Sequence, residues 1–312
     1  MNKIQKILII NDIHHIFYDL LSKYNIQLIN KFDINYDTLC DIIKNYDGLI
    51  IRSKKFVIDK NIINKGTRLK FIARAGSGID NIDTISAKKK SINIISAAGG
   101  NRDAVAEHII GMILNLTNNI CKANNEIKNG IWNRESNRST ELQHKTLGII
   151  GLGNTGSCLA KKIKSLNINV IAYDKYKTNY IGDYVKLVDE RYIFEFSDIL
   201  SINIPLNDTT KNMVDINYIN KFKKPIIFIN TSRGPIVKTT DLIKAIDSGK
   251  IISAGLDVLE IEKFPSLYNT EYFNRLSKMN KIILTPHVAG WSVESYKKIS
   301  EILADKIIKK YI

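Results

Sequence analysis

Residues 146–156 of the 312-residue chain read TLGIIGLGNTG. The β-branched run at the start predicts a buried strand, and the three glycines after it have the spacing G-x-G-x-x-G. Gly151 would permit the tight turn after the strand, and Gly153 would let a pyrophosphate come close to the backbone, while Gly156 would let the following helix pack near the strand. The segment therefore predicts the phosphate-binding turn of a dinucleotide site.

The acidic residue after the next expected strand indicates which dinucleotide this is. The run NVIAYD ends at Asp174, in the position where a carboxylate accepts both ribose hydroxyls and repels a 2′-phosphate. NAD is therefore favoured over NADP, although the adjacent Lys175 weakens the preference. The amides of Asn154 and Thr155 at the helix start would face the phosphates. The alternative, a βα turn without a nucleotide, does not explain strand, glycines, helix and acid together.

Short apolar runs alternate with stretches of helical period along the whole chain, which predicts parallel sheets with crossover helices. One long helix is expected over 102–127 and a last one near 292–310. The expected strands are residues 6–10, 48–53, 71–75, 92–96, 146–151, 169–174, 198–204, 225–231, 252–258 and 281–286. The sequence thus predicts the α/β class, with two doubly wound parallel-sheet domains. One comprises residues 1–98 plus 288–312, and the other, 99–287, is inserted into it.

The composition is that of a globular protein with a basic surface. Hydrophobic residues make up 44% and charged residues 25%, and the net charge is +15. The lysines are spread along the chain without a nucleic-acid-binding motif, so we expect no nucleic-acid partner. The richness in Ile, Lys and Asn is what an AT-biased genome would also give. The positive charge would still attract a small anionic substrate.

Neither a membrane segment nor a metal site is expected. No apolar run reaches the roughly 18 residues needed to span a bilayer, and the apolar stretch near the N-terminus is too short for a signal peptide. A cytoplasmic protein without a membrane partner is therefore expected. The three cysteines lack CxxC spacing and the five histidines are scattered, so the sequence suggests neither disulfides nor a metal.

Three polar residues follow expected strands in the second half of the chain. Arg233 lies in NTSRG, Glu262 lies behind GLDV, and His287 lies in TPHVAGW. Open parallel sheets bind ligands at the carboxyl ends of their strands, which makes all three candidates for a site. Taken singly, each could equally be a surface residue.

Together these segments resemble, in order, the signature segments of the D-isomer-specific 2-hydroxyacid dehydrogenases. Residues 72–83, IARAGSGIDNID, are similar to the family's substrate-domain loop, and residues 101–108, NRDAVAEH, are similar to the start of its interdomain helix. The resemblance therefore covers the whole chain. It implies a flavodoxin-like substrate-binding domain, residues 1–98 plus 288–312, and a Rossmann NAD-binding domain, residues 99–287.

The resemblance also implies a role for each candidate residue. His287 would be the general acid/base, Glu262 would bind its other ring nitrogen, and Arg233 would grip the substrate's carboxylate. The family analogy assigns the carboxylate-binding loop to Gly76, Ser77 and Gly78. It assigns the nicotinamide end of the site to Pro205, Thr231, Ser232, Asp257 and Gly290.

A further set of residues concerns the substrate. Arg52, Ser53, Arg74 and Arg134 resemble phosphate-facing positions of the D-3-phosphoglycerate dehydrogenases, with Arg134 reaching a partner subunit's site. The implied reaction is NAD-dependent oxidation of D-3-phosphoglycerate to 3-phosphohydroxypyruvate in serine biosynthesis. Two alternatives stay open: a glyoxylate or hydroxypyruvate reductase, or another D-2-hydroxyacid dehydrogenase, on the same scaffold, and an NAD-sensing corepressor-like binding protein.

The family analogy predicts a homodimer formed through the apolar face of the helix expected at 102–127. The sequence departs from the family pattern at Asn154-Thr155, where a basic and an apolar residue are common, and at Lys263, where proline is usual. Because the sequence ends at Ile312, we expect no C-terminal regulatory extension and no feedback inhibition by serine.

Overall fold

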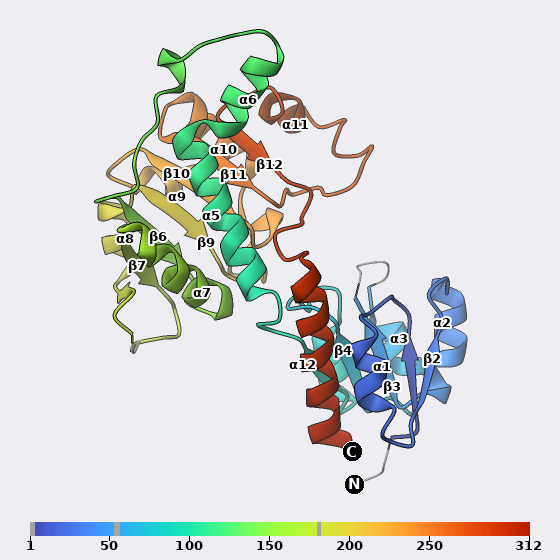
Figure 1. The fold of residues 1–312 in the computed structure, drawn as a ribbon. Coiled ribbons are helices and arrows are strands. Elements are labelled where there is room, and N and C mark those ends of the chain that lie inside the picture. Colours follow the sequence, from blue (N-terminus) through green and yellow to red (C-terminus); the bar gives the residue numbers. More distant parts are fainter. Residues whose placement is uncertain (1–3, 53–56, 180–181) are drawn as a thin grey trace. The chain divides into compact units, whose positions relative to one another are not determined.

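The computed structural model describes residues 4–52, 57–179 and 182–312. The chain divides into two compact units, Met1–Asn101 with Trp291–Ile312, and Arg102–Gly290 (Figure 1). The boundaries predicted from the sequence were 98/99 and 287/288. Among the described residues, no helix is both long enough and apolar enough to cross a membrane.

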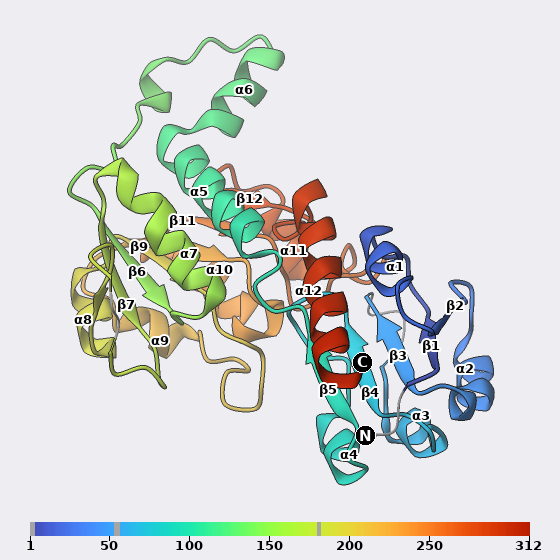
Figure 2. The same cartoon turned by 60° about the horizontal axis from the view of Figure 1, so that its bottom comes forward.

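The first unit is a five-stranded parallel sheet in the order β2-β1-β3-β4-β5. Helices α2, α3 and α4 cover one face, and α1 and α12 pack side by side on the other (Figure 2). This order is that of flavodoxin-like folds, as the sequence predicted. The elements are β1 Lys6–Ile9, α1 Ile16–Leu21, β2 Gln27–Asn30, α2 Tyr36–Ile42, β3 Gly48–Ile51, α3 Lys60–Lys65, β4 Phe71–Arg74, α4 Thr84–Lys89, β5 Asn93–Ser96 and α12 Val293–Tyr311.

The second unit is a seven-stranded parallel sheet in the order β12-β11-β10-β9-β6-β7-β8. Helices α5 and α7 cover one face, and α8, α9 and α10 cover the other. This order is the Rossmann order with one added edge strand, which confirms the predicted fold class. The elements are α5 Arg102–Asn118, α6 Ile120–Lys128, β6 Thr146–Ile150, α7 Asn154–Ile163, β7 Asn169–Tyr173, β8 Lys186–Leu187, α8 Glu190–Phe196, β9 Ile199–Ile202, α9 Ile216–Asn220, β10 Ile226–Asn230, α10 Thr239–Asp247, β11 Ile251–Leu256, α11 Glu271–Leu276 and β12 Ile282–Leu284.

Isoleucine-rich runs form the central strands because parallel sheets bury both faces. All four residues of β3 are buried, as are all four of β9. Polar side chains then fix where many helices begin. A residue before the helix accepts a hydrogen bond from the backbone N–H three residues on, which satisfies one unpaired donor of the first turn. These capping residues are Asn35, Asp59, Asp83, Asp189, Asp215, Thr270 and Ser292.

The prediction of one continuous helix over 102–127 is wrong. The helix ends at Asn118, and Asn119 has a left-handed backbone, with φ of 56°, before α6 begins at Ile120. The side chain of Asn115 accepts a hydrogen bond from the backbone N–H of Cys121, and Asn119 Nδ2 donates to the carbonyl oxygen of Arg138. Asparagine tolerates the left-handed conformation better than other non-glycine residues, so the break falls there.

Two strands went unpredicted. β2 lies at the edge of its sheet with half-exposed side chains, and β8 contains two residues. Neither has the buried apolar run by which the other strands were found.

Candidate active site

The glycine-rich turn lies at the point where the strand order of the second unit reverses, between β6 and β9. Gly151 has φ of 94°, and a Cβ there would stand 2.5 Å from the carbonyl oxygen of Asn203. A Cβ on Gly156 would stand 2.1 Å from the carbonyl oxygen of Gly151, whereas one on Gly153 would meet no atom of the described residues within 4 Å. Gly151 and Gly156 thus allow the tight turn, and Gly153 leaves the outer side of the turn open for a phosphate.

Asp174 is held against this turn. Its Oδ2 accepts the backbone N–H of Leu152 at 2.8 Å, and its Oδ1 accepts that of Tyr176 at 2.9 Å. Each carboxylate oxygen keeps a further lone pair with which to accept from a ribose hydroxyl. Lys177 Nζ donates to the carbonyl oxygen of Leu152 at 2.6 Å. The cation that reaches the turn is therefore Lys177, which the sequence analysis missed, while Lys175 lies over the ring of Tyr176.

These features fit a dinucleotide. The amides of Asn154 and Thr155 open the ten-residue helix α7, whose N-terminus carries partial positive charge. Pro205 follows β9, and its carbonyl oxygen accepts the hydroxyl of Thr210 at 2.7 Å. Thr231 is buried directly after β10. The predicted cofactor residues thus lie at one edge of one sheet. Gly151 follows β6, Asp174 follows β7, Pro205 follows β9, and Thr231 and Ser232 follow β10.

Asn230 shapes the turn that carries Arg233. This residue is 1% exposed, and its Oδ1 accepts both the backbone N–H and the hydroxyl of Ser232, at 3.1 and 2.7 Å. Its Nδ2 donates to the carbonyl oxygen of Arg233 at 3.1 Å. Asn230 was not predicted from the sequence, although an amide at the buried end of an apolar strand was the available signal.

Arg233 is half-buried, and its Nη1 donates to the carbonyl oxygen of Ser232 at 2.7 Å. A Cβ on the next residue, Gly234, would stand 1.8 Å from the carbonyl oxygen of Leu259. The segment after β10 therefore packs directly on the segment after β11, which continues to Glu262.

Glu262 and His287 are in direct contact. Glu262 Oε2 lies 3.0 Å from His287 Nδ1, and the two side chains are 29% and 36% exposed. The carboxylate accepts the Nδ1 proton, which leaves Nε2 to exchange a proton with a ligand. His287 has a left-handed backbone, with φ of 57°, and its N–H donates to the carbonyl oxygen of Asp257 at 2.8 Å.

Neighbouring strands bring these residues to one edge. β10 pairs with β11, and β11 pairs with β12, in parallel register. Arg233, Glu262 and His287 each follow the carboxyl end of one of these strands, at the edge that also holds the glycine turn. The arrangement offers one cation and one imidazole–carboxylate pair beside a dinucleotide site.

In the first unit, Arg52 lies where the strand order reverses, between β1 and β3. Its backbone N–H donates to Asn11 Oδ1 at 2.7 Å and its Nη1 to the carbonyl oxygen of Asp12 at 3.3 Å. The guanidinium carbon stands 4.3 Å from the ring centroids of both Trp291 and Tyr296. Parallel sheets bind ligands at such points, and the two rings restrain the plane of the guanidinium.

Tyr296 is itself held in place. Its hydroxyl donates to Asp12 Oδ2 at 2.6 Å. Burial, and then the hydrogen bond to Asp12, raise the pKa of Tyr296 to about 12. The ring next to Arg52 is therefore a neutral phenol at physiological pH. Ser53, predicted beside Arg52, lies outside the described residues.

The loop after β4 carries the remaining candidates of the first unit. Arg74 Nη1 donates to the carbonyl oxygen of Ala75 at 2.9 Å, and a Cβ on Gly76 would stand 1.9 Å from the same nitrogen. Arg74 is therefore folded onto the loop. The hydroxyl of Ser77 donates to Asn101 Oδ1 at 2.8 Å, and Gly78 follows it. The guanidinium of Arg74, predicted to face a phosphate, thus donates to the backbone of its own loop.

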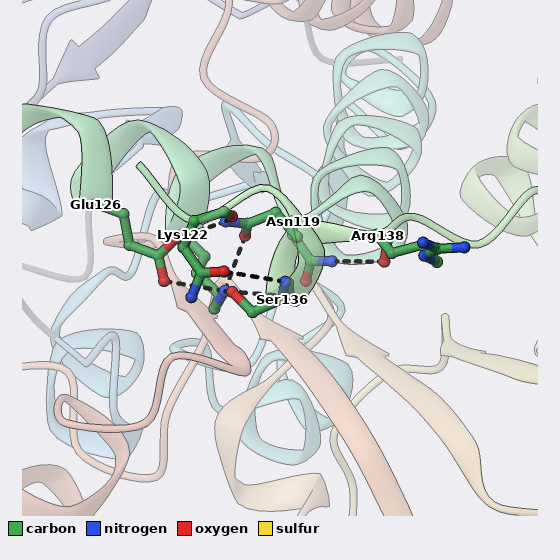
Figure 3. Close-up of polar contacts among 7 residues, drawn as sticks. Asn119, Lys122, Glu126, Ser136 and Arg138 are labelled. Carbon is green, nitrogen blue, oxygen red and sulfur yellow. Dashed lines mark hydrogen bonds and ion pairs between the residues drawn. The ribbon is translucent and has the colours of Figure 1, made fainter. Parts of the chain in front are cut away.

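Arg134 is not brought to the other candidates of its unit. It lies beyond α6, in a segment that Figure 3 shows tied back to the helix: Lys122 Nζ donates to Ser136 Oγ at 3.0 Å, and Asn119 Nδ2 donates to the carbonyl oxygen of Arg138 at 3.3 Å. The end of α5 lines a cavity of about 320 Å³ together with residues that precede β6, β9 and β10. The segment that carries Arg134 therefore begins and ends near the edge of the sheet where the strands start. The glycine turn lies at the opposite edge, where the strands end.

Comparison with known proteins gives a family match and relatives that are similar over most of this chain. The family profile described as D-isomer specific 2-hydroxyacid dehydrogenase, NAD binding domain, matches residues 110–289. A hydroxypyruvate reductase of Thermotoga maritima is 34% identical over 93% of this chain and 93% of its own. A D-3-phosphoglycerate dehydrogenase of Archaeoglobus fulgidus is 34% identical over 97% of this chain and 56% of its own, so the chain spans little more than half of that relative.

Solved structures share the whole architecture. A glyoxylate reductase from Paecilomyes thermophila superposes with a TM-score of 0.85 at 25% identity, covering 99% of this chain and 97% of its own. An acyclic imino acid reductase in complex with NADPH and D-Arg superposes with a TM-score of 0.86 at 25% identity, covering 98% and 96%.

Proposed function

The chain belongs to the D-isomer-specific 2-hydroxyacid dehydrogenases, NAD-dependent enzymes, and from this premise we propose that its substrate is D-3-phosphoglycerate. The product would be 3-phosphohydroxypyruvate, and the reaction would serve serine biosynthesis. The observation that carries the proposal is Arg52, a cation in contact with two aromatic rings at the point where the strand order of the first unit reverses. Lactate or glyoxylate needs one cation for its carboxylate, whereas a phosphorylated acid needs a second.

The residues of the second unit would perform the proton chemistry. NAD, when bound, supplies the hydride acceptor. His287 Nε2 takes the hydroxyl proton of the substrate as the C–H bond at the same carbon breaks, so that one hydride and one proton leave and a ketone remains. Glu262 keeps the proton on Nδ1 and stabilises the imidazolium that forms. Arg233 binds the substrate's carboxylate and orients the reacting carbon.

The test compares phosphorylated and unphosphorylated acids. We expect turnover of 3-phosphoglycerate, and we expect Arg52→Ala to lower its kcat/KM by about 10- to 100-fold, since a hydrogen bond between charged groups contributes about 1.5–3 kcal/mol. Activity on D-glycerate should stay nearly unchanged. Lys88→Ala removes a charge from exposed Lys88 of the same unit and controls for long-range attraction.

A glyoxylate or hydroxypyruvate reductase is the second candidate. The similarity to the Thermotoga maritima hydroxypyruvate reductase, 34% identity over 93% of each chain, supports it. Activity confined to unphosphorylated acids, with Arg52→Ala indistinguishable from the parent enzyme, would establish this candidate and refute the first.

We further propose a homodimer, formed through α6 and the segment after it. The sequence analysis placed the interface on the apolar face of 102–127, but α5 packs that face into its own unit through Val105, Ala106, Ile109, Met112 and Ile113. No residue of α6 is buried. The exposed apolar side chains are Ile120, Ile127, Ile131 and Trp132, the last 86% exposed. The hydrogen bonds in Figure 3 tie residues 136–138 to α6, which restrains the segment between them and lowers the entropy lost on association.

A further inference from the structure

A chain of polar contacts connects α5 with the turn that carries His287. His108 Nε2 lies 3.1 Å from Thr285 Oγ1, and Thr285 Oγ1 lies 2.6 Å from Asp257 Oδ1. A hydroxyl has one proton, and the carboxylate can only accept. Thr285 therefore donates to Asp257, and His108 donates from Nε2 to Thr285. All three residues belong to the second unit.

The carboxylate at the end of this chain fixes the backbone on both sides of the turn. The side chain of Asp257 is fully buried, with 0% exposed. Its Oδ1 accepts the N–H of Val288 and its Oδ2 accepts the N–H of Ala289, both at 2.9 Å. Its backbone carbonyl accepts the N–H of His287. Asp257 thus binds three successive amides.

This turn needs such support. His287 has a backbone conformation that L-residues rarely adopt, and surrounding contacts must hold it there. A fully buried carboxylate also needs hydrogen-bond donors around it. In the described part of the chain, His108 Nε2 also stands 3.8 Å from Asp257 Oδ1.

We propose that His108 is a positioning residue for His287. By directing the Thr285 hydroxyl at Asp257 Oδ1, His108 keeps the carboxylate oriented to accept the N–H groups of Val288 and Ala289, which follow His287 directly. The imidazole of His287 then stays on Glu262. This role rests on the proposed function in so far as it concerns turnover. The placement of the turn itself does not depend on which acid is the substrate.

Paired variants of His108 test the inference. Gln can place its amide nitrogen where the Nε2 of His108 lies, whereas Met fills the space without a donor. We expect His108→Met to lower kcat by about tenfold, a usual cost of losing a supporting hydrogen bond, and to accelerate amide hydrogen exchange in residues 285–290. His108→Gln should restore both toward the parent values. His144→Asn, at an exposed histidine of the same unit, should change neither.

Thr285→Val removes the middle contact and should reproduce the defect of His108→Met. The double variant should be no worse than either single one, because both interrupt the same chain. Unchanged exchange in residues 285–290 of His108→Met overturns the inference. Equal losses in His108→Met and His108→Gln, in step with a lower Tm, also overturn it, since they indicate packing alone. If the parent enzyme turns over no 2-hydroxy acid, the proposed function fails, and accelerated exchange restored by Gln still supports the placement of the turn by His108.

Discussion

His287 and Glu262 form an imidazole–carboxylate pair. Because this pair is assigned to proton transfer and not to the cofactor, a change in it should affect turnover without affecting NAD binding. We expect His287→Ala to lower kcat by about 10²- to 10⁴-fold, the usual contribution of a general acid/base. The Kd for NAD, measured by calorimetry, should change by no more than about twofold, since the imidazole is assigned to the substrate's proton. Glu262→Gln, which keeps the shape of the side chain, should cause a smaller loss of kcat. A His287→Ala enzyme that loses NAD binding in parallel would contradict the role.

Asp47 stabilises the first unit in a pH-dependent way. This carboxyl is buried, and burial alone would raise its pKa, but the N–H groups of Gln5 and Lys6, together with Lys70 and Arg68, outweigh burial and lower the pKa of Asp47. Its stabilisation is therefore present above the unfolded pKa, about 3.9, and is lost as pH falls through the lower folded value.

The corresponding variant is Asp47→Asn. We expect it to lower the free energy of unfolding by about 2 kcal/mol at pH 7, because it weakens hydrogen bonds to a charged group. Urea denaturation across pH should show the difference from the parent protein shrinking below about pH 4. Asp41→Asn, at a side chain that is 75% exposed, serves as the control and should have no comparable effect. A difference that stays constant with pH would be inconsistent with this account.

The residues that could be identified from the sequence are those with an unusual side chain in a local pattern. Arg233, Glu262 and His287 stood out because a charged or titratable group followed an apolar run. Asn230 did not, because an asparagine bonded within its own turn, here to Ser232 and Arg233, is an ordinary pattern. Thr285 and Lys177 did not, because their partners come from other strands or turns. Hydrogen bonds of this kind depend on which strands are adjacent, and a local pattern does not contain that information.

The glycines in the turn between β6 and α7 have two different roles: Gly153 leaves space for a ligand, and Gly156 allows close packing of the backbone. We expect Gly153→Ala to fold normally, because its Cβ faces open space, and to weaken NAD binding by about tenfold or more by obstructing a charged hydrogen-bonded contact. Gly156→Ala should instead destabilise the unit by about 1–3 kcal/mol, since its Cβ would collide with backbone.

Thermal unfolding and NAD titration distinguish these outcomes. Gly111→Ala, within α5 and without a described atom near its Cβ, is the matched control. It should raise stability by about 0.5–1 kcal/mol through helix propensity. Full NAD affinity in Gly153→Ala would exclude close approach of a phosphate at that glycine.

Strands were predictable from the sequence where the chain has a continuous apolar run. The ten strands expected from such runs all exist, the central ones because a parallel strand covered on both faces must be apolar throughout. β2, Gln27–Asn30, was missed because polar residues interrupt its run and its side chains are half-exposed. The break after Asn118 was missed because helical periodicity continues across it, and only the side-chain contacts of Asn115 and Asn119 reveal the change of direction.

The association proposed through α6 concerns the molecule as a whole. We expect the parent protein to sediment as a dimer and Trp132→Asp to sediment as a monomer, because a buried unpaired carboxylate costs several kcal/mol. Tyr176→Asp, at an aromatic residue that is 83% exposed on the same unit, should leave the dimer intact. A parent protein that is monomeric at micromolar concentration would refute the interface.

The alternation of strands and helices predicted two doubly wound parallel sheets, and the family resemblance implied their flavodoxin-like and Rossmann orders. The position of Arg134 did not follow. It depends on the direction that the chain takes after α5, and the break at Asn119 sets that direction.

Helix α12 belongs to the first unit although 189 residues of the second unit, Arg102–Gly290, precede it in the chain. Its Ile299, Leu303 and Ile307 complete the apolar core beside α1. During synthesis on the ribosome, the second unit is therefore complete while the first still lacks one of the two helices that cover one face of its sheet. The order in which the units are completed is then the reverse of the order in which they are begun, and the first unit keeps part of its apolar core exposed until the last residues are made.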